Sequence, residues 1–573
     1  MSESRLSSQR RGVHIVRALI AGGVTDVVLA PGSRSAPLAV ALSTAERMGL
    51  LRLHVRIDER SAGYLALGLA KGSRPARPVA VVTTSGTAAV NLHPAVVEAS
   101  YGGVPLIALT ADRPPRLRGV GAHQTINQVG LFASAVRAEF DLTAPASTGH
   151  ADADADAVRA ALAVATDVAH PGPVHLNIAL DEPLVDPDFD LAAALGQPIP
   201  RAASTFAQPL INEQLWDPIA QGETGLIVVG DVTGMDSAAS TAAINQFASR
   251  TGWPVLTEPS APQLSAGLQH GALLLGDQKF MADHHPETVV TVGRVGLHRS
   301  VMSLLRSVDR HIVVDPRPTG WYCDPFGTAK FKADALPTRW PAEPAPTVWL
   351  DQWIRADADM ARQVERVLSG RALFTGPLVA RKAVASLNAE DQFVIGPSWP
   401  MRHVGEAGGH ISAHCIANRG TSGIDGIIST TWGAALRHGG YTLALIGDLT
   451  SVYDRNGLLG APGEEQPHLT YLVVDNDGGG IFHSLEQAAP QFAACFERVF
   501  GTPRGYGVAQ LLATPGVSVT TVHDTAELDA TLAQCRAVTG VHIVVAQCEE
   551  RSVEADVVTM LRNLSVVSEL GTS

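Results

Sequence analysis

Short apolar runs rich in Val, Ile and Leu alternate with segments of helical periodicity in the first part of the chain. The runs lie at Val27–Leu29, Leu53–Ile57, Val79–Val82, Leu106–Leu109 and Val174–Ile178. Apolar runs of this length, separated by helical segments, are typical of parallel strands covered by helices on both faces. This pattern predicts an α/β domain over residues 1–185.

Two further blocks, 205–345 and 350–573, repeat this pattern. Their apolar runs lie at 225–230, 288–293, 311–315, Phe393–Ile395, Leu443–Ile446, Leu472–Val474 and Ile543–Val545. Proline-rich stretches at 181–209 and 337–346 predict linkers, and the amphipathic segment Trp349–Val367 leads into the third block. A chain of 573 residues is too long for one hydrophobic core. The predicted fold class is α/β, with three domains that each hold a parallel sheet flanked by helices.

Polar, glycine-containing loops directly follow predicted strands of the first and third blocks. They are PGSRS (31–35), DERS (58–61), TSGT (84–87), TADRP (110–114), GPSWPMR (396–402), NRGTSGIDG (418–426), GDLT (447–450) and DNDGGGIF (475–482). In open parallel sheets, ligands bind beyond the carboxyl ends of the strands. We therefore expect two domains that carry functional residues and a middle domain that is largely structural.

Composition and charge exclude several classes of protein. The formal net charge of −13 disfavours nucleic acid as a partner, because phosphate binding requires a basic surface. The sequence contains no run of about 18 uninterrupted apolar residues, so no membrane span is predicted. Arg and His within the apolar N-terminal segment predict an amphipathic helix instead of a signal peptide. The five cysteines are widely spaced without a CxxC pair, which favours reduced cytoplasmic thiols over disulfides or a zinc site.

The most specific pattern pairs Asp448 with Asn476, 28 residues further along the chain, and each residue closely follows an apolar run. A strand, a crossover helix and the next parallel strand occupy about 25–30 residues, so this spacing brings both strand ends together. The Asp448 carboxylate, the Asn476 side-chain oxygen and the Gly478 carbonyl can then supply hard oxygen ligands to Mg²⁺. Diphosphate oxygens and a water would complete the octahedron, and the helix after GDLT offers N–H groups to the diphosphate.

Each half of this pattern also has a less specific explanation, because Gly-Asp and Asn-Asp are common turn residues after strands. The crossover spacing and the flexible Gly478–Gly480 run favour the metal site. A dinucleotide-binding loop is the competing phosphate site, but no GxGxxG follows any predicted strand.

Glu59 follows the second predicted strand and opens a helical segment. A glutamate at this position is explained by the helix dipole, which it complements, with Asp58 as the N-cap. The pattern alone assigns Glu59 no catalytic role.

Taken together, Glu59, the Asp448/Asn476 motif and a middle domain with few polar loops resemble the thiamine-diphosphate enzymes of the 2-oxo-acid decarboxylase and acetolactate synthase type. The resemblance implies a pyrimidine-binding domain at 1–185, a central α/β domain at 205–345 and a diphosphate- and metal-binding domain at 350–573. It also implies thiamine diphosphate and Mg²⁺ or Mn²⁺ as cofactors. Glu59 is then expected to hydrogen-bond N1′ of the cofactor pyrimidine and so promote loss of the thiazolium C2 proton.

The resemblance also implies an oligomer. In this family the active site lies between the first domain of one subunit and the last domain of another, so we expect a homodimer or a homotetramer with small-molecule substrates.

The loops quoted above, together with GAHQTINQ (121–128), are similar to one branch of these enzymes, the 2-succinyl-5-enolpyruvyl-6-hydroxy-3-cyclohexene-1-carboxylate synthases of menaquinone biosynthesis. This resemblance covers the first and third blocks nearly end to end and is weak in the middle block. It implies a transferase that decarboxylates 2-oxoglutarate and adds the resulting carbanion to isochorismate. Both substrates are dianions, so the site must hold four carboxylates.

The residues that match this branch fall into two groups. Substrate contacts are implied at Ser33, Arg34, Arg113, Gln124, Arg299, Ser398, Arg402, Arg419 and Phe482. Cofactor contacts are implied at Glu59, Ser398, Ile424, Asp448, Leu449, Asn476, Gly478 and Ile481. Any one arginine also fits a surface ion pair, and the isoleucines and phenylalanine also fit a core. Only five of the 43 basic residues are lysine, which fits a GC-rich genome as well as fork-shaped recognition of carboxylates.

Two positions depart from the branch. Pro397 precedes Ser398 where the branch often has asparagine, and His298–Arg299 stands where it has Lys-Arg, so one fixed charge becomes titratable. His284 and His285 are interpreted as solvated loop residues.

Two alternatives remain open. Another thiamine-diphosphate decarboxylase or carboligase, of the acetolactate synthase type, would not need the arginines. A non-catalytic homologue would have lost Glu59 or Asp448.

Overall fold

The computed structural model describes residues 7–143, 150–196, 216, 223–233, 237–265, 267–315, 323–337, 348–370 and 372–566. The chain packs into two compact units. The first comprises Met1–Ala207, Asn418–His438 and Asp454–Gln466, and the second comprises Gln208–Ala417, Gly439–Tyr453 and Pro467–Ser573.

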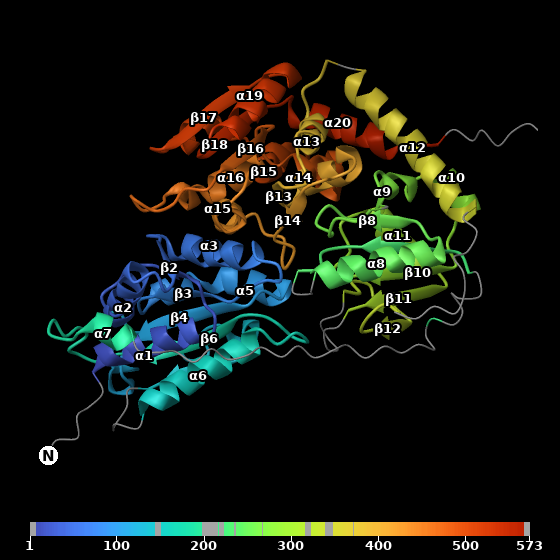
Figure 1. Ribbon diagram of the computed structural model, residues 1–573. Helices are drawn as coiled ribbons and strands as arrows, with labels where there is room; N and C mark the ends of the chain where they lie inside the picture. The colour runs from blue at the N-terminus through green and yellow to red at the C-terminus, as the bar shows by residue number, and fades with distance from the viewer. Residues whose placement is uncertain are drawn as a thin grey trace, which may run out of the picture. The chain divides into compact units, whose positions relative to one another are not determined.

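The first unit is built on a parallel sheet with the strand order β2-β1-β3-β4-β6-β5 (Figure 1). Its strands are β1 (Asp26–Leu29), β2 (Arg52–Val55), β3 (Val79–Thr83), β4 (Leu106–Asp112), β5 (Glu139–Leu142) and β6 (Val174–Ala179). Its helices are α1 (Ser8–Ala21), α2 (Ala36–Arg47), α3 (Glu59–Lys71), α4 (Thr87–Val90), α5 (His93–Gly102), α6 (His150–Ala165), α7 (Leu191–Leu195) and α15 (Ile427–His438). Helices α1, α2 and α6 share a core with one face of the sheet, and α3 and α5 cover the other face (Figure 1).

Because helices cover both faces of this sheet, its strands could be predicted from their apolar residues. Strands β1, β3, β4 and β6 are buried along their whole length, and most of their positions are therefore apolar. The predicted strands are confirmed, except that Ile57 lies beyond β2 and is 82% exposed. Strand β5 was missed because its sequence, EFDL, alternates polar and apolar residues at the edge of the sheet.

Helix α3 is buried on almost all sides because α15 packs against it (Figure 1). The two backbones approach closely at Gly68 and Gly433. A Cβ at Gly68 would collide with the carbonyl of Thr430, and one at Gly433 with the carbonyl of Leu65. Glycine at both contacts lets the helices pack at this short separation.

The second unit holds two parallel sheets, ordered β12-β11-β10-β7-β8-β9 and β14-β13-β15-β16-β18-β17. The first consists of β7 (Gly225–Val229), β8 (Val255–Thr257), β9 (Gly267–Leu268), β10 (Thr288–Val292), β11 (Arg310–Val314) and β12 (Phe331–Ala333). The second consists of β13 (Gln392–Ile395), β14 (His414–Ile416), β15 (Thr442–Gly447), β16 (Leu469–Asp475), β17 (Val517–Val522) and β18 (Val541–Gln547). Three parallel, helix-flanked sheets confirm the predicted fold class.

The helices of the second unit surround these two sheets. They include α8 (Ser237–Thr251), α9 (Gly271–Leu274), α10 (Gln278–Asp283), α11 (Arg299–Ser307), α12 (Val348–Ser369), α13 (Gly376–Ala385), α14 (Trp399–His403), the π-helix η5 (Val404–Gly408), α16 (Asp448–Tyr453), α17 (Ala493–Phe496), α18 (Val508–Leu512), α19 (Thr525–Ala537) and α20 (Arg551–Arg562). The amphipathic segment predicted at Trp349–Val367 forms α12, whose apolar face packs with the first sheet and with α20.

His284 corrects the interpretation of the paired histidines. His285 is exposed as expected, but His284 is buried at the C-terminus of α10 and stacks on Phe280, with ring centroids 4.3 Å apart. An imidazole that stacks on a phenylalanine is part of the core, although its neighbour is solvated. Among the residues described above, no helix is both long and apolar enough to cross a membrane.

Candidate functional site

The loops after β1, β3 and β4 bring several predicted residues together at one edge of the first sheet. Parallel strands present their carboxyl ends on the same edge, and these three strands are neighbours. The Arg113 side chain donates hydrogen bonds to Ser85 Oγ and to the carbonyl of Gln124, the latter at 2.6 Å. Gln124 Nε2 donates to the Ser85 carbonyl at 3.1 Å. Arg113, Gln124 and Ser85 therefore form one cluster.

Arg34 lies close to this cluster. Its backbone N–H donates to Thr84 Oγ1 at 3.3 Å, and its guanidinium donates to the Leu180 carbonyl and to Glu182, at 3.2 and 3.4 Å. Burial, and second the Arg34 guanidinium, lower the pKa of Arg113. Arg34 and Arg113 place two positive charges close together at the end of the sheet, and such a pair attracts an anion. Ser33, in the same loop as Arg34, is exposed.

Glu59 is the first residue of α3. The helix begins there because Asp58 caps it, accepting hydrogen bonds from the N–H groups of Arg60 and Ser61 at 2.9 and 3.2 Å. The Glu59 carboxylate is half-buried and accepts a hydrogen bond from Asn91 Nδ2 at 3.2 Å. Asp58 already satisfies the helix terminus, so the cap does not require Glu59.

Arg419 and Ile424 belong to a loop that joins the first unit. Buried Glu98 on α5 accepts hydrogen bonds from the N–H groups of Gly420 and Thr421 at 2.8 and 2.6 Å. Arg419 donates to Ser422 Oγ at 3.2 Å, and Ile424 is half-buried. The structure therefore places these two residues in the same compact unit as Glu59.

Asp448 directly follows β15 in the second unit, as the first residue of α16, and is 3% exposed. Its carboxylate accepts hydrogen bonds from the N–H of Leu449 at 2.6 Å, from the N–H of Gly478 at 2.7 Å and from Arg504 at 2.8 Å. Arg504 also contacts Asp475 at 2.7 Å. Burial raises the pKa of Asp448 well above its usual range, although Arg504 opposes this shift.

Asn476 and Gly478 lie at the end of β16, the strand next to β15. The Asn476 amide nitrogen donates to Glu554 at 3.3 Å. Gly478 has a φ of +131°, and a Cβ there would collide with the Gly501 carbonyl, so glycine is required by both conformation and space. The hydrogen bond from Gly478 to Asp448 joins the two loops, which bears out the adjacency inferred from their spacing.

The remaining predicted residues of the third sheet surround these loops. Ser398 follows β13 with a φ of +71° and caps α14, and its carbonyl accepts a hydrogen bond from Arg402 at 3.1 Å. Ile481 and Phe482 lie in the turn after the metal motif and are half-buried, with Phe482 against Phe500.

Known proteins resemble this chain over most of its length. The family model described as "Thiamine pyrophosphate enzyme, N-terminal TPP binding domain" matches residues 10–131. Relatives named 2-succinyl-5-enolpyruvyl-6-hydroxy-3-cyclohexene-1-carboxylate synthase come from Saccharopolyspora erythraea (41% identity, covering 90% of this chain and 92% of the relative), Thermobifida fusca (43%, 87% and 89%) and Paenarthrobacter aurescens (40%, 93% and 92%). The chain belongs to this synthase family.

Membership of a thiamine-diphosphate synthase family raises the question of whether these residues fit the cofactor and its metal. They do. The Asp448 carboxylate is buried beside Asp475 and Arg504, a set whose net negative charge a divalent cation would balance. The amide nitrogen of Asn476 is engaged by Glu554, so its oxygen is left for the cation. Within the described ranges, no group of three or more His, Cys, Asp or Glu side chains could hold a metal ion.

One predicted substrate residue belongs to the middle sheet and not to these loops. Arg299 is exposed at the first position of α11, on the middle sheet. His298, beside it, is buried with Nδ1 3.7 Å from Glu406, which also pairs with Arg562. His298 therefore faces an internal ion pair and is turned inward.

The structure adds three residues to this arrangement. Ser85 was within reach of sequence reasoning, because it lies in the quoted TSGT loop. Arg504 lies in an ordinary polar turn, and Glu554 has the position of any acidic residue in an amphipathic helix. The sequence does not single out Arg504 or Glu554; only the contacts of Arg504 with Asp448 and of Glu554 with Asn476 reveal them.

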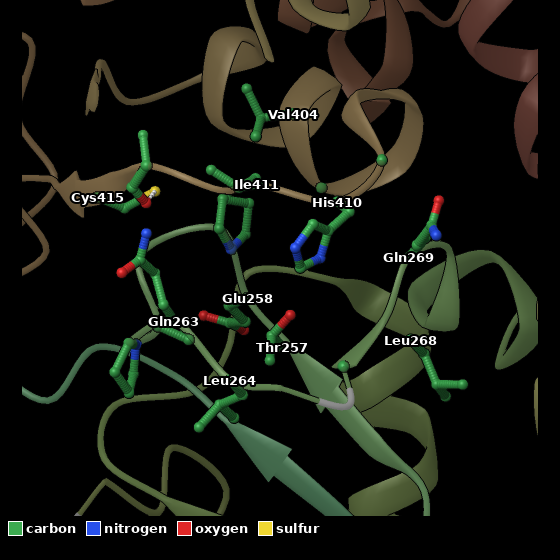
Figure 2. Close-up of a pocket in the computed structure, with 17 residues that line it drawn as sticks. Thr257, Glu258, Gln263, Leu264, Leu268, Gln269, Val404, His410, Ile411 and Cys415 are labelled. Carbon is green, nitrogen blue, oxygen red and sulfur yellow. Dashed lines mark hydrogen bonds between the residues drawn. The ribbon is translucent and has the colours of Figure 1, made fainter. Parts of the chain in front are cut away.

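A separate recess lies in the second unit between the 257–269 loop and the 404–415 segment. Figure 2 shows Gln263 and Glu258 on one side and His410 and Ile411 on the other. Glu258 accepts hydrogen bonds from the N–H groups of Gly296 and Leu297 at 2.7 and 2.6 Å. None of the predicted synthase residues lines this recess.

Proposed function

We propose that this chain makes 2-succinyl-5-enolpyruvyl-6-hydroxy-3-cyclohexene-1-carboxylate by decarboxylating 2-oxoglutarate and adding the resulting succinyl carbanion to isochorismate. The observation that carries the proposal is the 41% identity with a synthase of that name over 90% of the chain. The clustered residues at the strand ends support it, because closely spaced guanidiniums suit substrates that carry several carboxylates.

Thiamine diphosphate, when bound, supplies a nucleophilic carbon and accepts the electrons released with CO₂. Glu59 would hydrogen-bond N1′ of the cofactor pyrimidine and hold the shared proton, and Ile424 would pack against the cofactor. Asp448, Asn476 and Gly478 would hold Mg²⁺ or Mn²⁺, and Leu449, Ser398 and Ile481 would contact the cofactor.

Arginines bind the substrate carboxylates. Arg34 and Arg113 supply two guanidiniums at one strand edge, and Arg299, Arg402 and Arg419 supply the others, with Ser33, Gln124, Ser398 and Phe482 as further contacts. Bidentate charge-assisted hydrogen bonds from arginine hold a carboxylate in one orientation, which aligns it for carbon–carbon bond formation.

The proposed activity is tested by incubating the protein with 2-oxoglutarate, Mg²⁺ and thiamine diphosphate, with and without isochorismate. We expect CO₂ release coupled to product formation when isochorismate is present. Steady CO₂ release at the same rate without isochorismate would favour the simple decarboxylase alternative. No CO₂ release under either condition would favour a non-catalytic homologue.

Replacing Arg113 by Gln is expected to raise the KM for 2-oxoglutarate or isochorismate by about 10- to 100-fold, because a hydrogen bond to a charged group contributes about 1.5–3 kcal/mol. Steady-state kinetics with each substrate varied in turn measures the effect. Arg116→Gln is the matched control, since Arg116 is an exposed arginine paired with Asp181. Unchanged KM values for both substrates in Arg113→Gln would contradict the assignment.

The active enzyme is proposed to be at least a homodimer in which Glu59 of one protomer and Asp448 of another serve the same site. The family resemblance supports this arrangement. The scattered cysteines support a cytoplasmic location.

Mixing two inactive variants tests the shared site. Glu59→Gln and Asp448→Asn chains, unfolded together and refolded as a mixture, should recover about a quarter of the wild-type activity, because half of the dimers are mixed and each mixed dimer has one intact site. Each variant refolded alone is the control. If both residues served a site within one chain, the mixture would remain as inactive as its components.

A further inference from the structure

Glu554 is a fully buried carboxylate, 0% exposed, in the first turn of α20. One of its oxygens lies 2.7 Å from His403 Nε2 at the end of α14. The other accepts a hydrogen bond from Asn476 Nδ2 at 3.3 Å. Segments that are far apart in sequence thus converge on one candidate metal ligand, and all of them belong to the second unit.

Two glycines make room for this contact. A Cβ at Gly376 would lie 2.5 Å from the Glu554 oxygen and 2.8 Å from His403 Nε2. A Cβ at Gly480 would lie 2.8 Å from the Asn476 amide nitrogen and 2.5 Å from the Trp399 ring. Separations this short exclude any larger residue, so the space around the carboxylate and the amide is closely confined.

The chemistry of the two ends of an amide makes this contact directional. An ionised carboxylate only accepts hydrogen bonds, so it pairs with the NH₂ end of asparagine and repels the carbonyl end. A cation binds the carbonyl end and repels the NH₂ end. The carboxylate at Glu554 therefore selects the amide orientation that a metal ion needs, and the hydrogen bond from His403 holds that carboxylate in place.

We infer that Glu554 and His403 are positioning residues that keep the carbonyl oxygen of Asn476 directed at the metal ion. The inference rests on the proposed metal site and adds to it residues that do not touch the metal. Partners that orient metal ligands in this way typically change metal affinity by about 10- to 100-fold when they are replaced.

The direct test is Mn²⁺ binding to the full-length protein in saturating thiamine diphosphate, followed by the paramagnetic resonance signal of free Mn²⁺. Glu554→Gln should weaken Mn²⁺ binding by about 10- to 100-fold, because glutamine offers both a donor and an acceptor and no longer selects one amide orientation. The matched control is Glu258→Gln, which neutralises another buried glutamate that has backbone partners on the middle sheet. It should leave the Mn²⁺ affinity unchanged.

A double variant separates positioning from a general loss of packing. In Glu554→Gln combined with Asn476→Asp, the glutamine amide donates to one aspartate oxygen and leaves the other for the cation. The double variant should bind Mn²⁺ more tightly than either single variant, since Asn476→Asp alone places two carboxylates against each other. A residue that only filled space would give no such recovery.

The outcomes distinguish the two proposals. Wild-type protein that fails to bind Mn²⁺ with thiamine diphosphate would overturn the proposed cofactor site itself. Wild-type protein that binds Mn²⁺, with Glu554→Gln binding it equally tightly, would overturn only the positioning role. Equal weakening in Glu258→Gln would overturn it as well, because the effect would then follow from losing any buried carboxylate.

Discussion

Glu59→Gln is expected to lower kcat by about 10²- to 10⁴-fold, the usual contribution of a positioned acid–base group. Glutamine keeps the size of the side chain and can still accept from Asn91, but it cannot share a proton with the cofactor pyrimidine. Helix α3 should remain intact, because Asp58 and not Glu59 caps it. Steady-state kinetics with 2-oxoglutarate and isochorismate measures the loss, and calorimetry should show that thiamine diphosphate still binds.

Asp58→Asn is the matched control for this variant. It removes a neighbouring negative charge from the same helix terminus, and asparagine caps helices as well as aspartate does. Its kcat should stay within a few-fold of wild type. A Glu59→Gln enzyme that kept more than about a tenth of the wild-type kcat would lie outside the range expected for acid–base catalysis and would remove Glu59 from the mechanism.

Asp448→Asn is expected to weaken the free energy of metal-ion binding by about 2–5 kcal/mol, which is the usual effect of removing one partner of a buried charge pair. Thiamine diphosphate should then bind weakly, because its diphosphate depends on the cation. Titration with Mn²⁺ and calorimetry with thiamine diphosphate measure both effects. Thermal unfolding without cofactors should show some loss of stability, because the amide NH₂ of the variant would face donors that the Asp448 oxygens accept from in the wild type.

The control for Asp448 is Asp477→Asn, which removes a charge from the same pair of loops at a position that is 56% exposed in its side chain. Its Mn²⁺ affinity should change by less than about threefold, because exposed ion pairs contribute about 0–1 kcal/mol. Asp448→Asn protein that retained wild-type affinities for both cofactors would rule out the metal site.

The buried strands could be predicted because their environment leaves a local signal. Strands β3, β4 and β10 are covered on both faces and are therefore mostly apolar along their length. Strand β17 was missed because it is an edge strand that is largely exposed and carries serine and threonine. Edge strands lose the apolar pattern because only part of their surface is buried.

The contacts of the candidate site also divide into those that the sequence predicts and those that it does not. The meeting of Asp448 with the Asn476 loop followed from the number of residues in a right-handed crossover between parallel strands. The contacts of Arg113 with Ser85 and Gln124 link three loops, and no local pattern records which loops will meet. No local pattern records the inward orientation of His298 toward Glu406 either.

The amino-acid sequence by itself determined the α/β class, the strands at the centres of the three sheets, the loops at their carboxyl ends and the family. These features depend on periodicity and on short spacings, which are local properties of the chain. The tertiary structure alone decided that α15 packs on α3, that Arg504 pairs with Asp448 and that Glu554 accepts a hydrogen bond from Asn476. Such contacts join residues distant in sequence, and their energies depend on burial and distance, which exist only once the chain has folded.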